Sequence, residues 1–292
     1  MSRHPDIFEE IVRLRREGIP AALATIVGTR GSTPGRTSMR LLVLGDGTFV
    51  GTVGGGCLEA EVYDTAMQVL ADEQPRSLQF RLTEQDSPDS GLMCGGEVTI
   101  FVEPITTPSL WIFGAGHVSK ALCQVAALAG FRVTVADDRA TFATAERFPE
   151  AAATAAAPYA ELVARMPIRQ NSYGVVVTRG HKEDAHVLEA LAARFAAGER
   201  LRFLGMIGST TKQALLWKHL RAHGVGDDFL ASVRTPMGVY VGGKTHEEIA
   251  VSVVAELIAV RRTGKDMAGS WSGRDKPKGR VQGVRELPAA DA

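Results

Sequence analysis

The chain has 292 residues, 45% of them hydrophobic and 23% charged, which is enough for the cores of about two soluble domains. Its 33 basic and 33 acidic residues cancel, and this balance argues against a nucleic-acid-binding protein that works through bulk charge. No apolar run reaches the roughly 18 residues of a membrane span, and the first residues lack a signal-peptide core. Three cysteines are too few and too uneven for a disulfide framework, so we expect a cytoplasmic protein with no membrane partner.

The first elements surround a loop rich in turn-forming residues. Apolar spacing predicts a packing helix over 6–17 and a strand over 21–27. The loop Arg30-Gly-Ser-Thr-Pro-Gly-Arg36 then offers the Ser32 hydroxyl, the Arg36 guanidinium and free amides to a phosphate. An ordinary surface turn with solvated arginines is the alternative.

A glycine run with a cysteine follows a predicted hairpin, whose strands cover 39–44 and 48–53. Gly54, Gly55 and Gly56 allow positive φ and a close approach of the backbone, so their amides can point together at an anion. Cys57 then begins a helix predicted to reach residue 72, where the positive end of the helix dipole favours an anionic group such as a thiolate. The alternative is a tight turn followed by a small buried cysteine.

A second cysteine lies beside glycines at Cys94-Gly95-Gly96, between strands predicted over 77–82 and 97–102. Neither Cys57 nor Cys94 belongs to a Cys-x-x-Cys or Cys-x-x-His pair, so a structural zinc site is not expected. Two soft sulfur ligands near amides and an arginine suit a molybdenum or copper centre that carries an anionic group.

Residues 104–109 contain two prolines and predict a linker between domains 1–103 and 110–262. Beyond it come a strand over 110–113, the turn Gly114-Ala-Gly116-His117, a helix, and a strand that ends at Asp137. This order is that of a dinucleotide-binding βαβ unit, although Ser119 replaces the third glycine or alanine. The sequence therefore predicts an α/β protein with a mixed N-terminal domain and a Rossmann-like, doubly wound C-terminal domain.

The remaining segments continue the alternation of strands and helices. Strands are expected over 174–178 and 202–206, helices over 183–197, 211–223 and 245–262, and helix with variable loop over 141–167. His181 follows a strand end, where it can bind a ligand, transfer a proton or only hold its loop. The segment from Gly205 to Lys212 suits a phosphate, or supplies a simple helix cap. Residues 263–292 predict a mobile tail.

Taken together, these motifs resemble those of the xanthine dehydrogenase accessory protein (XdhC/CoxI) family. The resemblance covers about residues 8–262 and rests on several motifs in one order. They are Gly31-Ser-Thr-Pro34, Gly54-Gly-Gly-Cys-Leu-Glu59, Cys94-Gly-Gly96, Phe113-Gly-Ala-Gly-His-Val118, Val177-Thr-Arg-Gly-His181, Gly205-Met-Ile-Gly-Ser209 and Glu247-Glu-Ile-Ala-Val-Ser252.

The resemblance implies a chaperone more than an enzyme. Family members bind molybdenum cofactor, protect it while a cysteine desulfurase adds sulfur, and insert it into a molybdenum hydroxylase such as xanthine dehydrogenase. The implied cofactor-binding residues are Ser32, Arg36, Gly54, Gly55, Gly56, Cys57, Glu59, Cys94, Gly114, Gly116, His117, Asp137 and His181, with Cys57 and Cys94 near the molybdenum. A homodimer is expected, and the cofactor is molybdopterin or its cytidine dinucleotide form.

Three departures from the family pattern bear on the ligand. Gly35 separates Pro34 from Arg36, Thr210 and Thr211 stand where arginines are common, and His246 replaces a frequent proline. Two other functions stay open: an NAD(P)-dependent oxidoreductase using Gly114, Gly116 and Asp137, and an adaptor between hydroxylase and desulfurase. The oxidoreductase is less favoured because the sequence offers no clear Tyr-x-x-x-Lys or similar acid–base set.

Overall fold

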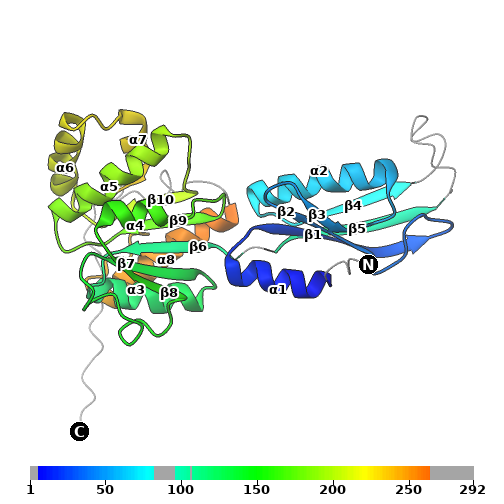
Figure 1. Cartoon of the computed structure of the whole chain (residues 1–292), viewed down its shortest axis with the longest axis horizontal. Coiled ribbons are helices and arrows are strands. Elements are labelled where there is room, and N and C mark those ends of the chain that lie inside the picture. The colour runs from blue at the N-terminus through cyan, green and yellow to red at the C-terminus, as the bar shows by residue number, and fades with distance from the viewer. Residues whose placement is uncertain (1–5, 82–95, 106, 264–292) are drawn as a thin grey trace, which may run out of the picture.

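A computed structural model describes residues 6–81, 96–105 and 107–263 of the chain, which form two lobes side by side (Figure 1). Of the tail expected over 263–292, Thr263 is the last residue of a helix, and residues 264–292 lie outside the described residues. The first lobe contains α1 (Ile7–Glu17), β1 (Ala21–Arg30), β2 (Arg40–Leu44), β3 (Phe49–Gly51), α2 (Gly56–Asp72), β4 (Arg76–Arg81) and β5 (Glu97–Pro104).

The first lobe is built on an antiparallel sheet of strand order β3-β2-β1-β5-β4. Side chains alternate between its two faces, as the pleat of a strand requires. Ala22, Ala24 and Ile26 pack with α2, whereas Ala21 and Leu23 pack with α1. Both faces of β1 are therefore buried over Ala21–Ala24, which explains why this part of the strand is a continuous apolar run.

The second lobe contains one parallel sheet with helices on both faces. Its elements are β6 (Ser109–Phe113), α3 (His117–Leu128), β7 (Arg132–Asp137), β8 (Ala153–Ala156), α4 (Tyr159–Arg165), β9 (Ser172–Val176), α5 (His181–Ala196), β10 (Phe203–Met206), α6 (Thr210–Ala222), α7 (Asp227–Ser232), β11 (Val233–Arg234) and α8 (His246–Thr263). The strand order is β11-β10-β9-β6-β7-β8, with every neighbouring pair parallel. This is the doubly wound order, so the predicted Rossmann-like fold is confirmed.

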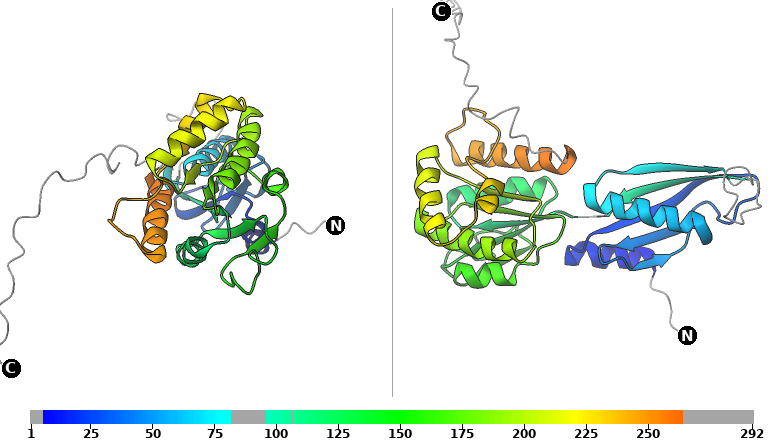
Figure 2. Two further views of the ribbon diagram at one scale, coloured as in Figure 1. Left: turned by 90° about the vertical axis from the view of Figure 1, so that its left-hand side faces the viewer. Right: turned by 90° about the horizontal axis from the view of Figure 1, so that it is seen from above.

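Two apolar cores cover the faces of this sheet. Helices α3 and α8 bury one face through Leu122, Ala126 and Leu257, among others. Helices α4, α5, α6 and α7 bury the other. Figure 2 shows these layers from two further directions. Because both faces are covered, the exposed functional groups gather at the edges where strands end.

The lobes meet through hydrogen bonds to the ends of α1 and α2. Arg202 donates to the carbonyl oxygens of Ala71 and Asp72, each at 3.3 Å. Arg169 Nη1 donates to the carbonyl oxygen of Gly18 at 2.8 Å. Arg202 and Arg169 precede β10 and β9, so the first lobe contacts the amino edge of the parallel sheet. Cations at helix C-termini are favourable because carbonyl groups there lack helical partners.

The sequence prediction missed three elements. The segment 141–167 contains the strand β8 as well as the helix α4, and neither α7 nor β11 was expected. Alanine has low strand propensity, so Ala153–Ala156 gives no strand signal, and only the parallel pairing with β7 makes it one.

Along the described ranges, no helix has the length and apolar character needed to cross a bilayer.

Candidate functional site

The glycine run of the first lobe forms a tight turn from β3 into α2. Gly54, Gly55 and Gly56 have φ values of 123°, 78° and 66°, which side-chain-bearing residues rarely adopt. Added Cβ atoms on Gly55 or Gly56 would meet nothing within 4 Å. These two glycines therefore leave open space over the start of α2, where Gly55 is the N-cap and no side chain caps the helix.

The loop over 30–36 lies against this turn and against the start of β5. A Cβ on Gly35 would come within 2.6 Å of the carbonyl oxygen of Val53, and one on Gly54 within 3.1 Å of the amide nitrogen of Gly35. A Cβ on Gly96 would overlap the carbonyl oxygen of Ser32. Glycine thus permits close backbone packing between three segments that are distant in sequence. The structure brings the Gly31, Gly54 and Gly96 motifs together on one surface.

Glu59 holds the turn in place from inside the helix. Its Oε2 accepts hydrogen bonds from Thr52 Oγ1 at 2.5 Å and from the Val53 amide at 3.1 Å. Thr52 Oγ1 in turn accepts from the Gly54 amide at 3.1 Å. Glu59 therefore acts on this surface by positioning the glycine turn. The sequence prediction did not select Thr52 as a site residue. The available signal was its position just before the glycine run.

The chemically active side chains of this surface are accessible. Ser32, Arg36 and Cys57 are all exposed to solvent. No ion-pair partner of Arg36 occurs among residues 6–81, 96–105 and 107–263. Cys94 lies outside the described residues, although Gly96, two positions later, contacts the loop. Cys123 belongs to the core, where burial raises the pKa of its thiol to about 11.

The second group of predicted residues lies at the carboxyl edge of the parallel sheet. Gly114, with φ 112°, follows β6, and a Cβ there would overlap the carbonyl oxygen of Val177. Its amide donates to the carbonyl oxygen of Ala136 at 2.7 Å. Gly116 is the N-cap of α3, and an added Cβ there would meet open space. The strand–turn–helix geometry of a dinucleotide-binding unit is therefore present.

Asp137 is engaged in this turn and is only 1% exposed. Its carboxylate accepts from the Ala115 amide at 2.7 Å, from the Arg139 amide at 3.0 Å and from the Arg139 guanidinium at 2.8 and 3.0 Å. Burial alone would raise the pKa of this carboxyl, but these hydrogen bonds outweigh it and lower the pKa. In this arrangement Asp137 shapes the glycine turn and is not free to accept a bond from a ribose.

Histidines from three helix starts lie at this edge. His117 begins α3 and stacks on His246, the first residue of α8, with ring centroids 5.4 Å apart and an angle of 12° between planes. His181 is the exposed first residue of α5. The sequence prediction selected His117 and His181 but missed His246 as a site residue. The one available signal for His246 was that it stands where the family pattern frequently has proline.

Several charges at this edge are already paired. Arg179 forms a bidentate ion pair with Asp138, in which Nη1 lies 2.6 Å from Oδ1 and Nη2 lies 2.9 Å from Oδ2. Lys212, a predicted phosphate ligand, has its ammonium 2.5 Å from the buried carboxylate of Asp184. Asp184 also accepts from Thr178 Oγ1 at 2.6 Å. Lys212 therefore neutralises a buried acid, and Ser209 caps α6 by accepting from the Lys212 amide.

The two groups of predicted residues do not meet within one chain. Cys57 starts α2, whose other end contacts the amino edge of the second lobe, whereas Gly114 lies at the opposite, carboxyl edge (Figure 1). A helix rises 1.5 Å and a strand about 3.3 Å per residue, so α2 and β6 together separate Cys57 from Gly114 by on the order of 40 Å. No single ligand of cofactor size spans both.

Comparison with known proteins places both lobes in related families. Residues 14–81 match the family described as the XdhC and CoxI family, and residues 110–257 match the XdhC Rossmann domain. The uncharacterized protein YqeB of Escherichia coli K12 is 34% identical over 258 residues, covering 88% of this chain and 46% of YqeB.

Two further relatives have informative names. One, from Bacillus subtilis 168, is named as a probable xanthine dehydrogenase subunit and is 32% identical over 163 residues, which are 55% of this chain and 44% of that protein. The molybdenum cofactor insertion chaperone PaoD of Escherichia coli K12 is 24% identical over 311 residues, covering 88% of this chain and 89% of PaoD. The chain spans about half the length of YqeB and of the Bacillus protein.

Proposed function

This chain belongs to the XdhC and CoxI family, and we propose on that basis that it is an accessory protein that holds molybdenum cofactor and delivers it to a molybdenum hydroxylase. Similarity to PaoD over nearly the whole of both chains supports this role, because PaoD is named as a molybdenum cofactor insertion chaperone. The protein would act as a carrier and maturation factor, with no catalytic residue of its own.

The observation that carries the proposal is the surface formed by the loop over 30–36, the turn Gly54–Gly56 and Gly96. Three glycine motifs pack together there through contacts that only glycine allows, and they leave Cys57, Ser32 and Arg36 accessible around open space. Molybdenum cofactor combines a phosphate-bearing pterin with a metal that binds soft sulfur ligands. The donors on this surface fit that combination.

In the proposed complex, the amides of Gly55 and Gly56, the Ser32 hydroxyl and the Arg36 guanidinium would hold the phosphate. The thiol of Cys57, together with Cys94, would lie near the metal. When bound to a hydroxylase, the molybdenum supplies the oxygen-transfer and redox chemistry. Here the chain's own residues would bind and shield the group, and Glu59 would keep the turn in the required shape.

The finer parts of the role are also proposals. We expect a xanthine dehydrogenase type of hydroxylase as acceptor and a cysteine desulfurase as sulfur donor, both in the cytoplasm. The cofactor is molybdopterin or its cytidine dinucleotide form. The cytidine form carries a second phosphate and a nucleoside, so it would need a longer anion-binding surface than the glycine turn alone offers.

A homodimer would give the second lobe a part in the same process. In one chain the two groups of predicted residues are far apart, as described above. In a head-to-tail dimer, the glycine turn of one copy would face the carboxyl edge of the other, with its stacked His117 and His246. The expected mass is twice that of the chain, and cross-links between Cys57 and the second lobe of the other copy would test the orientation.

The alternative, an NAD(P)-dependent oxidoreductase, has less support. The strand order and the Gly114 turn suit a dinucleotide. However, the Asp137 carboxylate that would bind a ribose already accepts bonds from Ala115 and Arg139. If this alternative were correct, titration with NAD or NADP would show saturable binding, measured as the heat of binding or as a change in Trp111 fluorescence.

The main test is a cofactor-retention experiment. The purified chain is incubated with molybdenum cofactor and separated by gel filtration, and the co-eluting pterin and molybdenum are measured. We expect co-elution with the natural chain, reduced retention with Arg36→Ala and strongly reduced retention with Cys57→Ala plus Cys94→Ala. Arg165→Ala, which removes an exposed arginine on α4 of the other lobe, is the matched control.

Two results would contradict the proposal. Lack of co-elution with the natural chain would argue against cofactor binding, and unchanged retention in the double cysteine variant would argue against this surface. Capture of the hydroxylase and the desulfurase without any bound cofactor would instead indicate a pure adaptor.

A further inference from the structure

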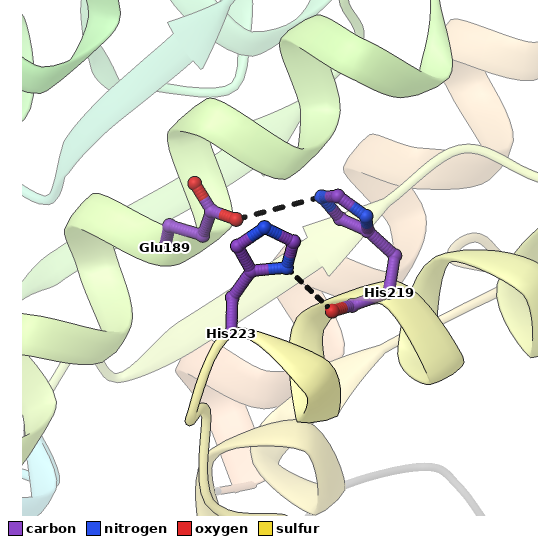
Figure 3. A group of neighbouring side chains, drawn as sticks. All are labelled: Glu189, His219 and His223. Carbon is purple, nitrogen blue, oxygen red and sulfur yellow. Dashed lines mark hydrogen bonds and ion pairs between the residues drawn. The ribbon is translucent and has the colours of Figure 1, made fainter.

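A cluster of metal-binding side chains lies on the second lobe, away from both groups described above. Glu189 on α5 and His219 and His223 at the end of α6 point toward one another (Figure 3). One ligand atom from each lies within 4.8 Å of the others. We propose that these three residues form a zinc-binding site. This inference does not depend on the proposed function.

The spacing of the two histidines is set by the helix. Residues four apart in an α-helix lie one above the other on the same face. His219 and His223 have this spacing, and their ring centroids are 4.1 Å apart. Leu216 and Leu220 of the same helix are buried against the lobe, which fixes how the helix presents the two rings.

The tautomer of His223 is determined by a hydrogen bond. Its Nδ1 lies 2.9 Å from the carbonyl oxygen of His219. A carbonyl oxygen only accepts, so Nδ1 carries a proton, and in the neutral imidazole Nε2 is then the nitrogen with the free lone pair. Metal-binding histidines commonly use one ring nitrogen for a backbone carbonyl and the other for the metal. His223 is prepared for this role before any metal arrives.

The distance between the other two ligands suits a shared ion. His219 Nε2 lies 3.6 Å from Glu189 Oε1, which is long for a direct hydrogen bond. Zinc binds nitrogen and carboxylate oxygen at about 2.0–2.2 Å, so two ligands of one tetrahedral ion are roughly 3.4 Å apart. The gap between these atoms is close to that value, and small side-chain rotations would bring His223 Nε2 to the same ion.

The donor set selects the class of ion. Two imidazoles and one carboxylate suit zinc and neighbouring transition metals, whereas magnesium and calcium prefer oxygen ligands throughout. The side chains of His219 and Glu189 are 50% and 33% exposed, so an ion can enter and a water can complete the coordination.

A bound ion would join the middle of α5 to the C-terminal end of α6. Near the first residues of both helices, the ion pair of Lys212 with Asp184 already joins them beside the carboxyl edge of the sheet. Zinc would thus add a second connection, farther along the chain of each helix, between two helices whose first residues border that edge. The expected effect is higher thermal stability of the second lobe when zinc is present.

The test measures binding of zinc alone to the full chain by isothermal titration calorimetry. Other cysteines and histidines can also bind zinc, so the comparison is between matched variants. We expect His219→Ala, His223→Ala and Glu189→Gln each to weaken one zinc-binding event by more than the roughly 10–100-fold typical of losing a residue that only supports a ligand. The control His186→Ala removes an exposed histidine of α5 and should leave that event unchanged.

Additional measurements make the outcome decisive. Circular dichroism checks that the variants fold, which is expected because the three side chains are on the surface. Nitrogen NMR of the imidazoles should show zinc on Nε2 of His223 with Nδ1 still protonated. Equal zinc stoichiometry and affinity in the natural chain and in a His219→Ala, His223→Ala double variant would overturn the proposal.

Discussion

The carboxylate of Asp137 accepts a hydrogen bond from the backbone amide of Ala115, with Oδ2 and N 2.7 Å apart. The bond joins the end of β7 to the glycine turn after β6. In a dinucleotide-binding fold, the acid at this position usually faces the ligand. Here it is buried and bonded to the protein itself, so this edge of the sheet differs from that of a typical NAD-binding protein.

We predict that Asp137→Asn destabilises the chain by about 3 kcal/mol. The charged hydrogen bonds from Arg139 would be weakened, and the backbone amide of Ala115 can lose its acceptor. The measurement is chemical denaturation at pH 7 monitored by fluorescence. Asp138→Asn, which alters the more exposed neighbour, is the control and should cost less. A similar loss in both variants would contradict the structural role of Asp137.

The pH dependence of the same residue has a definite sign. The pKa of Asp137 is lowered in the folded chain, so its contribution to stability is present above its unfolded pKa of about 3.9 and is lost as the pH falls through the lower, folded value. The natural chain should therefore lose more stability than Asp137→Asn between about pH 4 and the acid limit of folding. The test is to measure the melting temperatures of the natural chain and of Asp137→Asn over this pH range. If the prediction is wrong, the two melting temperatures will change with pH in parallel.

Glu73, at the boundary between the lobes, should behave in the opposite way. Burial raises its pKa, although Arg202 and Arg261 counteract part of the effect. Its Oε1 has no hydrogen-bond partner in the part of the chain that the structure describes. A raised carboxyl pKa adds stability below the unfolded value of about 4.3, and that contribution is lost as the pH rises through the folded value.

We therefore predict that Glu73→Gln stabilises the protein by about 1 kcal/mol at pH 8 and has little effect below about pH 4. Thermal melts at the two pH values measure the difference. Glu103, which lines the same surface cavity as Glu73 and Arg261, provides the control variant Glu103→Gln. Destabilisation by Glu73→Gln at pH 8 would show that the arginines depend on the Glu73 charge.

Two glycines of the Rossmann-like turn should differ in their tolerance of alanine. At Gly114, a Cβ would overlap the Val177 carbonyl oxygen and φ is positive, so Gly114→Ala should cost more than about 2 kcal/mol. At Gly116, φ is −82° and the space is open, so Gly116→Ala should change stability by less than about 1 kcal/mol. Denaturation curves of the pair compare them directly, and equal costs would contradict the described turn.

The glycine turn of the first lobe gives a prediction about thiol reactivity. Glu59→Ala removes the acceptor for Thr52 Oγ1 and the Val53 amide and should cost about 1–2 kcal/mol. Because the turn then loosens, the rate at which Cys57 reacts with a thiol reagent should change, while buried Cys123 stays protected. Glu61→Ala, on the same helix, is the control. An unchanged Cys57 rate would show that Glu59 does not position the turn.

Local patterns in the sequence were sufficient for much of this description. Continuous apolar runs such as Leu110–Phe113 predict buried strands, and the order of strand, glycine turn, helix and acid predicts a βαβ unit. These signals are local because side-chain periodicity and glycine conformations depend on neighbouring residues. Short elements such as β11 lack any such signal, since two residues carry no period.

The sequence by itself thus determined the fold class, the family motifs and the residue types available for binding an anion or a soft metal. Only the tertiary structure decided which of these residues share a surface. The Gly31, Gly54 and Gly96 motifs meet because strand order brings distant backbones into contact, whereas Cys57 and Gly114 are held at opposite ends by a helix and a strand. His246 beside His117, and Glu189 beside His219, likewise depend on helix packing, which no single segment specifies.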